Sequence, residues 1–454
     1  HDIDFHFDIS QQQQSNIFIT SSCESTMKNI TPICGETTSK NTTLTYHYDN
    51  DTTKIYGSSV KEGIKRYLDN TPLLLNTNPD ESSFYVGDLG VLHRQHLKWQ
   101  ALLPRIEPFY AIKCNPDTAA IKYLASLGVG FDCASKTEIQ QVLDVGVKPS
   151  QIVYAQPVKP TSFIQYAAQM NVALMTFDNQ EELYKIKKIF PEARLVLRIL
   201  VDDSHSAIPL GTKYGAPLHT TEELLQLARI LNLNVVGVSF HVGSECSNAN
   251  AYYHAVVHAR HVFDQAEKIG FQFELLDVGG GFNDSGIVDG AATFEKVAAV
   301  LAPAVDELFP SKNINRRYTK ISIRVSNFII LASSNTCYLF HVFTTQNYLD
   351  YINDGFYGSF SMPCLDKTKL SLKVLRKNGV YYFGNSLDGE RKYLSVIWGP
   401  TCCSLDRIEE QLLPELNIGD WLYLENFGAY TITGASTFNG FDKAKIIHVN
   451  SYLS

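Results

Sequence analysis

The stretch PFYAIKCNP, residues 108–116, is a β-prone apolar run that ends in Lys113 and is followed by a turn-forming Asn-Pro pair. A lysine at the end of a buried strand is either a stem that carries its charge to solvent or a reactive amine. Seven more runs of this kind follow, separated by helical patterns, at 129–135, 152–155, 174–179, 193–199, 235–243, 273–281 and 320–325. Strand and helix alternating eight times predict an α/β fold, a parallel (β/α)8 barrel of the TIM type.

Helix-entry signatures of the capping-box type support this alternation. A Ser, Asp or Thr stands three residues before a Glu at the start of three helical patterns, in the pairs Ser135 with Glu138, Asp178 with Glu181 and Thr220 with Glu223. In such a box the first side chain accepts a hydrogen bond from the backbone of the glutamate. Each pair therefore predicts the entry into a helix that connects two strands.

The composition limits the classes of partner and compartment. Hydrophobic residues make up 44% of the 454 residues and charged residues 19%, with a net charge of −8 and a pI near 5.9. An acidic chain without a long basic patch disfavours a nucleic-acid partner. Nine scattered cysteines without a CxxC pair favour reduced thiols, and no apolar run is long enough to span a membrane. We therefore expect a cytoplasmic protein without a membrane segment or a secretory signal.

The chain divides by composition into three parts. Residues 1–55 are rich in Gln, Asn, Ser and Thr, including QQQQ at 11–14, and we expect them to form a disordered polar arm. Residues 101–330 hold the eight runs and are expected to form the barrel. Residues 331–454 carry short β-prone runs with turns, which predict a second, C-terminal β-domain.

Titratable residues stand at or just before the carboxyl ends of six runs, namely Lys113, Asp132, Asp178, Arg198, His241 and Asp277. Barrel enzymes build their active sites at this rim. Each residue has an ordinary explanation by itself, such as a helix N-cap for Asp178 or a satisfied core histidine for His241. Their shared position is what favours an active site.

The seventh run ends in DVGGGF, residues 277–282. Three successive glycines allow backbone N–H groups to close on an anion, although a flexible turn explains them equally well. Barrels often hold phosphate with the loops after strands seven and eight. An amine that can form an imine and a cradle for an anion together favour pyridoxal 5'-phosphate as the cofactor.

Eight motifs between residues 80 and 454 resemble those of eukaryotic ornithine decarboxylases, which have the alanine-racemase-like fold, and the resemblance is closest to the fungal type. They are PFYAIKCNPD (108–117), GFDCASKTEI (130–139), VLRI (196–199), VVGVSFHVGSEC (235–246), LLDVGGGF (275–282), YINDGFYGSF (351–360), IWGPTC (397–402) and GDWLYLENFGAYT (419–431). The resemblance implies pyridoxal-phosphate-dependent decarboxylation of L-ornithine to putrescine and CO2 in polyamine biosynthesis. It also implies that residues 56–100 contribute to the C-terminal β-domain.

The resemblance assigns a cofactor role to each matching residue. Lys113 is identified as the Schiff-base lysine, and His241 as the residue that stacks on the pyridine ring. The phosphate is expected to contact Tyr430, Ser244 and the three glycines Gly279, Gly280 and Gly281. A polar shell near the imine is expected from Asp132, Glu138 and Arg198.

On the substrate side, the resemblance implies an active site made by two chains of a homodimer. Cys402 would reach into the neighbouring subunit's site and reprotonate the substrate carbon, whereas Asp366 would hold the distal amine of ornithine. Without the motif around it, Cys402 is better explained as a small buried hydrophobe. No metal is expected at this site.

Two segments depart from the family pattern. Where the family has an acidic residue followed by Pro-Gly-Arg at the end of the eighth strand, this chain reads ISIRVSNF (321–328), with Arg324 close to the position of the glutamate. The family uses that glutamate to protonate the pyridine nitrogen and that arginine to clamp the phosphate. The family sequence CDGLD reads CCSLD here (402–406), so Cys403 replaces an aspartate that binds the substrate amine.

Three interpretations follow from these matches and departures. The first is a decarboxylase that acts on ornithine or a similar basic amino acid. The second is a catalytically impaired paralogue that acts as a regulator by binding antizyme, as antizyme inhibitors do. The third is that the sequence of residues 318–345 reflects a gene-model error in an ordinary enzyme.

Overall fold

The computed structural model describes residues 44–48, 51–70, 82–283, 290–310, 322–325, 336–346, 348–366, 368–383 and 389–452. They belong to two compact units, a barrel unit (95–331) and a β-unit (1–94 with 332–454). Residues 1–43, most of the arm that the composition predicts to be disordered, lie outside the described residues, as do 318–321 and 326–335. The last part of the predicted arm holds two paired strands, 44–48 and 51–55.

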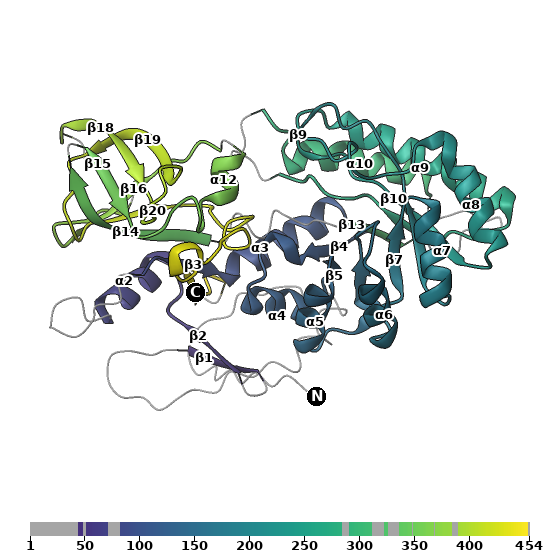
Figure 1. The fold of residues 1–454 in the computed structure, drawn as a ribbon, viewed down its shortest axis with the longest axis horizontal. Coiled ribbons are helices and arrows are strands. Elements are labelled where there is room, and N and C mark those ends of the chain that lie inside the picture. The colour runs from purple at the N-terminus through teal and green to yellow at the C-terminus, as the bar shows by residue number, and fades with distance from the viewer. Residues whose placement is uncertain are drawn as a thin grey trace, which may run out of the picture. The chain divides into compact units, whose positions relative to one another are not determined.

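The barrel unit contains a closed barrel of eight parallel strands, which confirms the predicted fold class (Figure 1). Each strand falls on one of the eight apolar runs of the sequence. The strands are β4 (Ile106–Ala111), β5 (Gly130–Cys133), β6 (Ile152–Tyr154), β7 (Leu174–Phe177), β8 (Arg194–Arg198), β10 (Asn234–Ser239), β12 (Leu275–Asp277) and β13 (Ser322–Val325). A short antiparallel pair, β9 (Ser206–Ile208) with β11 (Ser244–Cys246), stands apart from the barrel sheet.

Helices connect the barrel strands and flank them in Figure 1. They are α4 (Thr118–Ser126), α5 (Lys136–Asp144), α6 (Thr161–Gln169), α7 (Gln180–Ile189), α8 (Thr221–Ile230), α9 (Asn250–Ile269) and α10 (Phe294–Leu308). From α5 to α10 each helix contacts the next one along the chain. Their apolar faces are buried, as expected for amphipathic helices that cover a sheet.

The interior of the barrel is packed with apolar side chains, one from each of six strands. These side chains are Phe109, Val153, Leu174, Val196, Val236 and Leu275, and each is at least 95% buried. A filled barrel offers no channel for a ligand, so binding has to occur where the strands end. The filled core therefore predicts a binding site at the rim where the strands end.

The helix caps show one confirmed prediction and two that are wrong. The Ser135 side chain accepts a hydrogen bond from the backbone N–H of Glu138, as predicted. The cap of α7 is Asn179 and not Asp178, because the Asp178 carboxylate accepts a hydrogen bond from Gly215 N–H in another loop. Thr220 makes no side-chain cap, since its hydroxyl donates to the Pro217 carbonyl in the short turn that precedes α8.

Among the residues that the structure describes, the β-unit holds an eleven-stranded sheet and two helices that lie wholly within it. The strands are β1 (Leu44–Tyr48), β2 (Asp51–Ile55), β3 (Phe84–Asp88), β14 (Thr336–Gln346), β15 (Leu349–Ile352), β16 (Lys373–Lys377), β17 (Val380–Tyr381), β18 (Lys392–Trp398), β19 (Arg407–Pro414), β20 (Trp421–Leu424) and β21 (Lys445–Val449). The helices are α2 (Val60–Asn70) and α12 (Ser361–Leu365), and α3 (Leu89–Leu102) follows β3 directly.

Segments from both ends of the chain build the β-unit. Strand β3 pairs in parallel with β21 and antiparallel with β14. The buried Asp88 carboxylate at the end of β3 accepts hydrogen bonds from the backbone N–H groups of Gly90 and Ser451 at 2.9 Å each. The start and the end of the chain are therefore joined within one hydrogen-bonded sheet.

Two further properties concern the described residues only. None of their helices has both the length and the apolar character that a membrane crossing requires. The six cysteines whose side chains are described carry free thiols: Cys114, Cys133, Cys246, Cys364, Cys402 and Cys403.

A buried carboxyl group in the β-unit generates a prediction about stability. Asp350 in β15 is 3% exposed, and burial raises its pKa to about 6, against a smaller opposing effect of the Ser395 hydroxyl. Because the pKa in the folded protein lies above that of the unfolded chain, ionisation costs folding free energy as the pH rises from about 4 to 6. We expect Asp350→Asn to raise the free energy of unfolding at pH 7.5 by up to about 3 kcal/mol.

The measurement is urea unfolding of the parent and the Asp350→Asn variant between pH 4.5 and 7.5. The difference between them should shrink toward the acidic end. Asp442→Asn, at an exposed position of the same unit, serves as the matched control and should change little. A variant that is less stable than the parent at every pH would contradict the prediction.

Candidate active site

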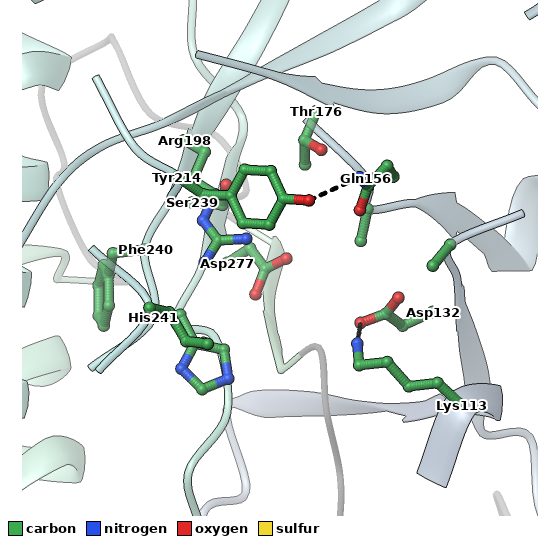
Figure 2. Close-up of a pocket in the computed structure, with 13 residues that line it drawn as sticks. Lys113, Asp132, Gln156, Thr176, Arg198, Tyr214, Ser239, Phe240, His241 and Asp277 are labelled. Atoms are coloured by element: carbon green, nitrogen blue, oxygen red, sulfur yellow. Dashed lines mark hydrogen bonds and ion pairs between the residues drawn. The ribbon is translucent and has the colours of Figure 1, made fainter. Parts of the chain in front are cut away.

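A pocket of about 200 Å³ opens at the carboxyl ends of the barrel strands (Figure 2). Residues from the ends of β4, β5, β6, β7, β8, β10 and β12 and from the loops after them line it. They are Lys113, Asp132, Ala134, Ala155, Gln156, Thr176, Arg198, Leu210, Tyr214, Ser239, Phe240, His241 and Asp277. Five of the six titratable residues that the sequence places at the rim are therefore together in one pocket, and Asp178 is not among them.

Lys113 and Asp132 form an ion pair inside the pocket. Lys113 lies in the turn that follows β4, and its Nζ is 3.6 Å from Oδ2 of Asp132 at the end of β5. The Lys113 side chain is 37% exposed and that of Asp132 only 1%. Figure 2 shows the amine directed at the carboxylate, so Lys113 does not act as a stem that carries its charge away into solvent.

The Asp132 carboxylate has hydrogen-bonding capacity to spare. Both of its oxygens are buried without a hydrogen-bond partner among the residues that the structure describes. Two hydroxyls of the same wall, Thr176 Oγ1 and Ser239 Oγ, share this condition. Buried polar groups in native proteins are normally paired, so these atoms indicate a place for a polar ligand.

His241 is a neutral imidazole in this pocket. It is 8% exposed, and burial, with smaller contributions from the cations Arg198 and Lys113, holds its pKa well below the ordinary value. Its Nδ1 accepts a hydrogen bond from the backbone N–H of Gly243 at 3.0 Å, which fixes the ring and leaves the proton on Nε2. An uncharged, oriented ring can stack on an aromatic ligand.

Arg198 lies on another side of the same pocket under an aromatic ring. Its guanidinium is 5.2 Å from the centre of the Tyr214 ring, and the Tyr214 hydroxyl accepts a hydrogen bond from Gln156 Nε2 at 2.8 Å (Figure 2). Burial lowers the pKa of Arg198, and the carboxylates Asp178, Asp277 and Asp132 oppose this effect. The guanidinium stays charged, because its reference pKa is far above neutrality.

The glycine turn after β12 is built for a close approach of backbones. Gly279 has φ +71°, and a side chain there would place Cβ 2.0 Å from the carbonyl oxygen of Phe240. The Asp277 carboxylate accepts a hydrogen bond from Gly279 N–H at 2.9 Å, and Tyr252 donates to the carbonyl of Gly280 at 2.8 Å.

The remaining residues of the predicted phosphate cradle lie beside this turn. Gly281 has φ +88°, and its Cβ would meet the carbonyl oxygen of Gly243 at 2.4 Å, so the turn lies against the loop after β10. Ser244 follows in that loop as the first residue of β11. Ser244, Gly279, Gly280 and Gly281 come within a few positions of the pocket lining but do not belong to it.

Glu138, the other acidic residue of the predicted polar shell, is occupied by its own helix entry. Its Oε2 accepts a hydrogen bond from Ala134 N–H at 2.5 Å. Burial raises its pKa, the Ala134 hydrogen bond opposes the rise, and the nearby Asp132 adds to it. Glu138 therefore stabilises the backbone that directly follows β5.

Four predicted site residues lie in the β-unit and are described within that unit. The Tyr357 hydroxyl donates to Cys403 Sγ at 3.0 Å, and Cys402 Sγ is exposed, 3.6 Å from Asn439 Oδ1. Asp366 is the exposed C-terminal cap of α12. Tyr430 adopts a left-handed backbone with φ +54°.

Sequence reasoning missed several residues of the pocket. Gln156 and Ser239 stand at strand ends, in the same place as the charged residues, and a search for all polar residues there would have included them. Thr176 lies inside its strand. Tyr214 comes from the long loop after β8, for which no sequence period exists, so no signal pointed to it.

The pocket residues fit pyridoxal phosphate. A primary amine, a neutral stacking ring and an unsatisfied buried carboxylate face one space, and a glycine turn lies beside it. An aldehyde cofactor requires the amine, its ring a flat partner, and its phosphate backbone N–H donors. Lys113, His241 and the 279–281 turn would supply these groups.

Comparisons with known proteins agree with this geometry. Residues 89–321 match the family model described as pyridoxal-dependent decarboxylase, pyridoxal binding domain. The chain is 44% identical to the ornithine decarboxylase of Neurospora crassa, over 82% of this chain and 81% of that one. It is 42% identical to antizyme inhibitor 2 of Xenopus laevis, over 81% of each chain.

A solved structure gives the same result for the fold. The arginine decarboxylase of Paramecium bursaria Chlorella virus matches with a TM-score of 0.77 and 31% identity, over 86% of this chain and all of the other. Together with the sequence matches, this confirms the resemblance to eukaryotic ornithine decarboxylases. The chain belongs to the family of pyridoxal-dependent decarboxylases.

Proposed function

We propose that this protein decarboxylates L-ornithine to putrescine and CO2 for polyamine synthesis, with pyridoxal 5'-phosphate as its cofactor. The observation that carries the proposal is the Lys113 amine at the end of β4, paired with a buried carboxylate in the barrel pocket. The ornithine decarboxylases among its relatives support the choice of substrate. We place the enzyme in the cytoplasm, as a homodimer with shared active sites.

The residues of the barrel divide the work of holding the cofactor. Lys113 provides the amine that binds it covalently, and the neutral His241 packs on its ring. Ser244 and the 279–281 turn contact the phosphate, while Asp132 and Arg198 set the charge near the reacting amine. When bound, the cofactor supplies the electron sink that accepts the electrons left by the departing carboxylate.

The residues of the β-unit complete the proposal on the substrate side. Tyr430 adds a contact to the phosphate, and Asp366 binds the distal amine of the substrate. Cys402 delivers a proton to the substrate carbon in the partner's site. Its exposed thiol is accessible for this role, and the neighbouring Cys403 takes part in substrate binding with the Tyr357 hydroxyl at its sulfur.

A second candidate function is regulation by binding antizyme. Two observations favour it, namely the 42% identity to an antizyme inhibitor and the departures at 321–328 and Cys403. A regulator needs the fold and its surface, whereas an enzyme needs the intact set of groups around the cofactor. The two functions are therefore distinguished by cofactor binding and turnover.

The position of Lys113 predicts where the cofactor attaches. Treatment of the cofactor-loaded protein with sodium borohydride should leave a pyridoxyl group on the tryptic peptide that contains Lys113, detected by mass spectrometry. Lys113→Ala should carry no label on that peptide, because no other amine lines the described pocket. A label of equal yield on a different lysine of the parent protein would refute the assignment.

The shared active site predicts complementation between two inactive variants. Lys113→Ala and Cys402→Ala should each lose most activity as homodimers. Mixing them in equal amounts should restore about a quarter of the parent activity, since half of the dimers then hold one intact site out of two. Subunit exchange is verified with differently tagged chains. Exchange without recovered activity would mean that each chain carries a self-contained site.

The departures at 321–328 and Cys403 predict impaired turnover. Loss of a charge-assisted hydrogen bond costs about 1.5–3 kcal/mol, so cofactor binding should weaken about 10- to 100-fold relative to intact relatives. We expect detectable cofactor binding, a raised KM for ornithine and kcat/KM lower by about 100-fold than in those relatives.

The measurement for this prediction is the release of labelled CO2 from ornithine at saturating cofactor, with Lys113→Ala as the blank. A rate equal to that of intact relatives would show that the altered segments are dispensable. A rate equal to the blank, without cofactor absorbance, would assign the protein to the regulatory function.

A further inference from the structure

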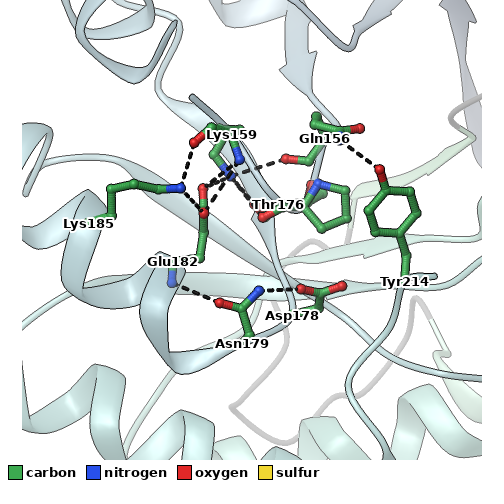
Figure 3. Close-up of polar contacts among 9 residues, drawn as sticks. Gln156, Lys159, Thr176, Asp178, Asn179, Glu182, Lys185 and Tyr214 are labelled. Atoms are coloured by element: carbon green, nitrogen blue, oxygen red, sulfur yellow. Dashed lines mark hydrogen bonds and ion pairs between the residues drawn. The ribbon is translucent and has the colours of Figure 1, made fainter. Parts of the chain in front are cut away.

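Lys159, to which the family resemblance assigns no role, is fully buried next to two residues that line the pocket. The Lys159 side chain has no exposed surface, and it follows β6 in the loop before α6. Its Nζ lies 2.5 Å from the carbonyl oxygen of Thr176, 2.8 Å from Oε1 of Glu182 and 3.1 Å from the carbonyl oxygen of Gln156 (Figure 3). A buried ammonium is costly unless all its protons are used, and here they are.

Two of the oxygens that Lys159 binds belong to residues of the pocket. Gln156 follows the end of β6, Thr176 is the penultimate residue of β7, and both line the cavity. These strand ends are neighbours in the barrel, but the pairing of β6 with β7 has only Tyr154 opposite Met175 in register. The Lys159 ammonium therefore joins two strand ends where the sheet itself supplies little hydrogen bonding.

Glu182 and Lys185 of α7 hold Lys159 in place. The second carboxylate oxygen of Glu182 pairs with Lys185 Nζ at 2.6 Å, and Lys185 Nζ also donates to the carbonyl oxygen of Lys159 at 2.5 Å. Glu182 is 1% exposed, and its carboxylate accepts from the backbone N–H of Lys159 as well. Backbone and side chain of Lys159 are thus fixed together.

Hydrogen bonds connect the cluster of Lys159, Glu182 and Lys185 to the Tyr214 loop of the pocket by two routes. Gln156, whose carbonyl binds Lys159, donates through its side chain to the Tyr214 hydroxyl at 2.8 Å. On the other route, Asn179 caps the N–H of Glu182 and donates to Asp178, and Asp178 accepts from Gly215 N–H at 2.9 Å. Tyr214 and Gly215 are adjacent, so the loop over Arg198 is held from both sides.

We propose that Lys159, together with Glu182, is a positioning residue for the cofactor pocket. It fixes the wall made by Gln156, Thr176 and Tyr214, and through Tyr214 it sets the ring that lies on the Arg198 guanidinium. Lys159 touches neither the cavity nor a ligand, so it acts through these residues. The inference rests on the proposed location of the cofactor in this pocket.

The role requires the protonated lysine. Burial lowers the pKa of Lys159 to about 8, while Glu182 opposes this effect, Lys185 adds to it and Asp178 opposes it. Among the described residues, the titratable Tyr154 ring also faces it, 5.7 Å from Nζ. As the pH rises through about 8, the neutral amine keeps two N–H donors for its oxygens and loses its attraction to Glu182, so the wall should loosen.

The test uses the full-length protein and 4'-deoxypyridoxine 5'-phosphate, a cofactor analogue that lacks the aldehyde and cannot react with Lys113. Its dissociation constant is measured by fluorescence titration for the parent, Lys159→Met and the double variant Lys159→Met/Glu182→Gln. The double variant removes both buried charges, which preserves folding where a single change leaves one charge unpaired. Lys188→Met changes an exposed lysine of the same helix, outside the contacts described above, and is the matched control.

We expect both Lys159 variants to bind the analogue about 10-fold more weakly, with Lys188→Met within about 2-fold of the parent. In a double-mutant cycle the Lys159→Met effect should shrink in a Gln156→Ala background, because the two changes act on the same wall. Folding is checked by thermal unfolding of each variant. A folded double variant with the parent's affinity would overturn the proposal and leave Lys159 a role in folding alone.

The pH profile provides a second, independent readout. Between pH 7 and 9.5 the parent should lose affinity with a midpoint near 8, after correction for the titration of the free analogue, and the double variant should not. A profile that is the same in the parent and in the folded double variant overturns the proposal. A parent that fails to bind the analogue at any pH would instead refute the proposed function.

Discussion

Closure of the barrel is the constraint on which the site depends. Strand β13 pairs with β4 through Ile323 opposite Ile106 and Val325 opposite Pro108, and it pairs with β12 on its other edge. In a closed parallel barrel every carboxyl end lies on one rim, whatever the separation in sequence. Lys113 and His241, 128 positions apart, line one pocket for this reason and not because of any local motif.

The rim brings several charged side chains into one cavity, and their surroundings differ from residue to residue. Lys113 and Arg198 face the carboxylates Asp132 and Asp277 within one cavity, so each charge has an opposite charge close by. Among the described residues, the charged groups that act on His241 are the cations Arg198 and Lys113, and burial beside them leaves it neutral. The same cavity therefore holds a charged guanidinium beside an uncharged imidazole, and a neutral flat ring is what an aldehyde cofactor with a flat ring requires for stacking.

The sequence predicted the parts of this structure that short-range physics encodes. Apolar runs mark the eight strands, and polar residues at their ends mark the rim, because both follow from burial along one strand. The cap of α7 could not be read correctly, since both Asp178 and Asn179 can cap a helix and the choice depends on a distant N–H at Gly215. Tyr214 and the Lys159 cluster could not be predicted either, because their contacts join loops whose approach is set by the closed barrel.

The distinction between fold and chemistry explains why the altered eighth strand is compatible with an intact barrel. A strand needs apolar, β-prone residues with free backbone groups, and SIRV at 322–325 meets this need as well as the family's own sequence does. By the family resemblance, the glutamate and arginine that this strand lacks are expected to serve the cofactor and not the sheet. An antizyme inhibitor and ornithine decarboxylases resemble this chain to a similar degree. Sequence identity over the whole chain therefore indicates a shared fold. Activity depends on the few residues that contact the cofactor ring, the cofactor phosphate and the substrate amine.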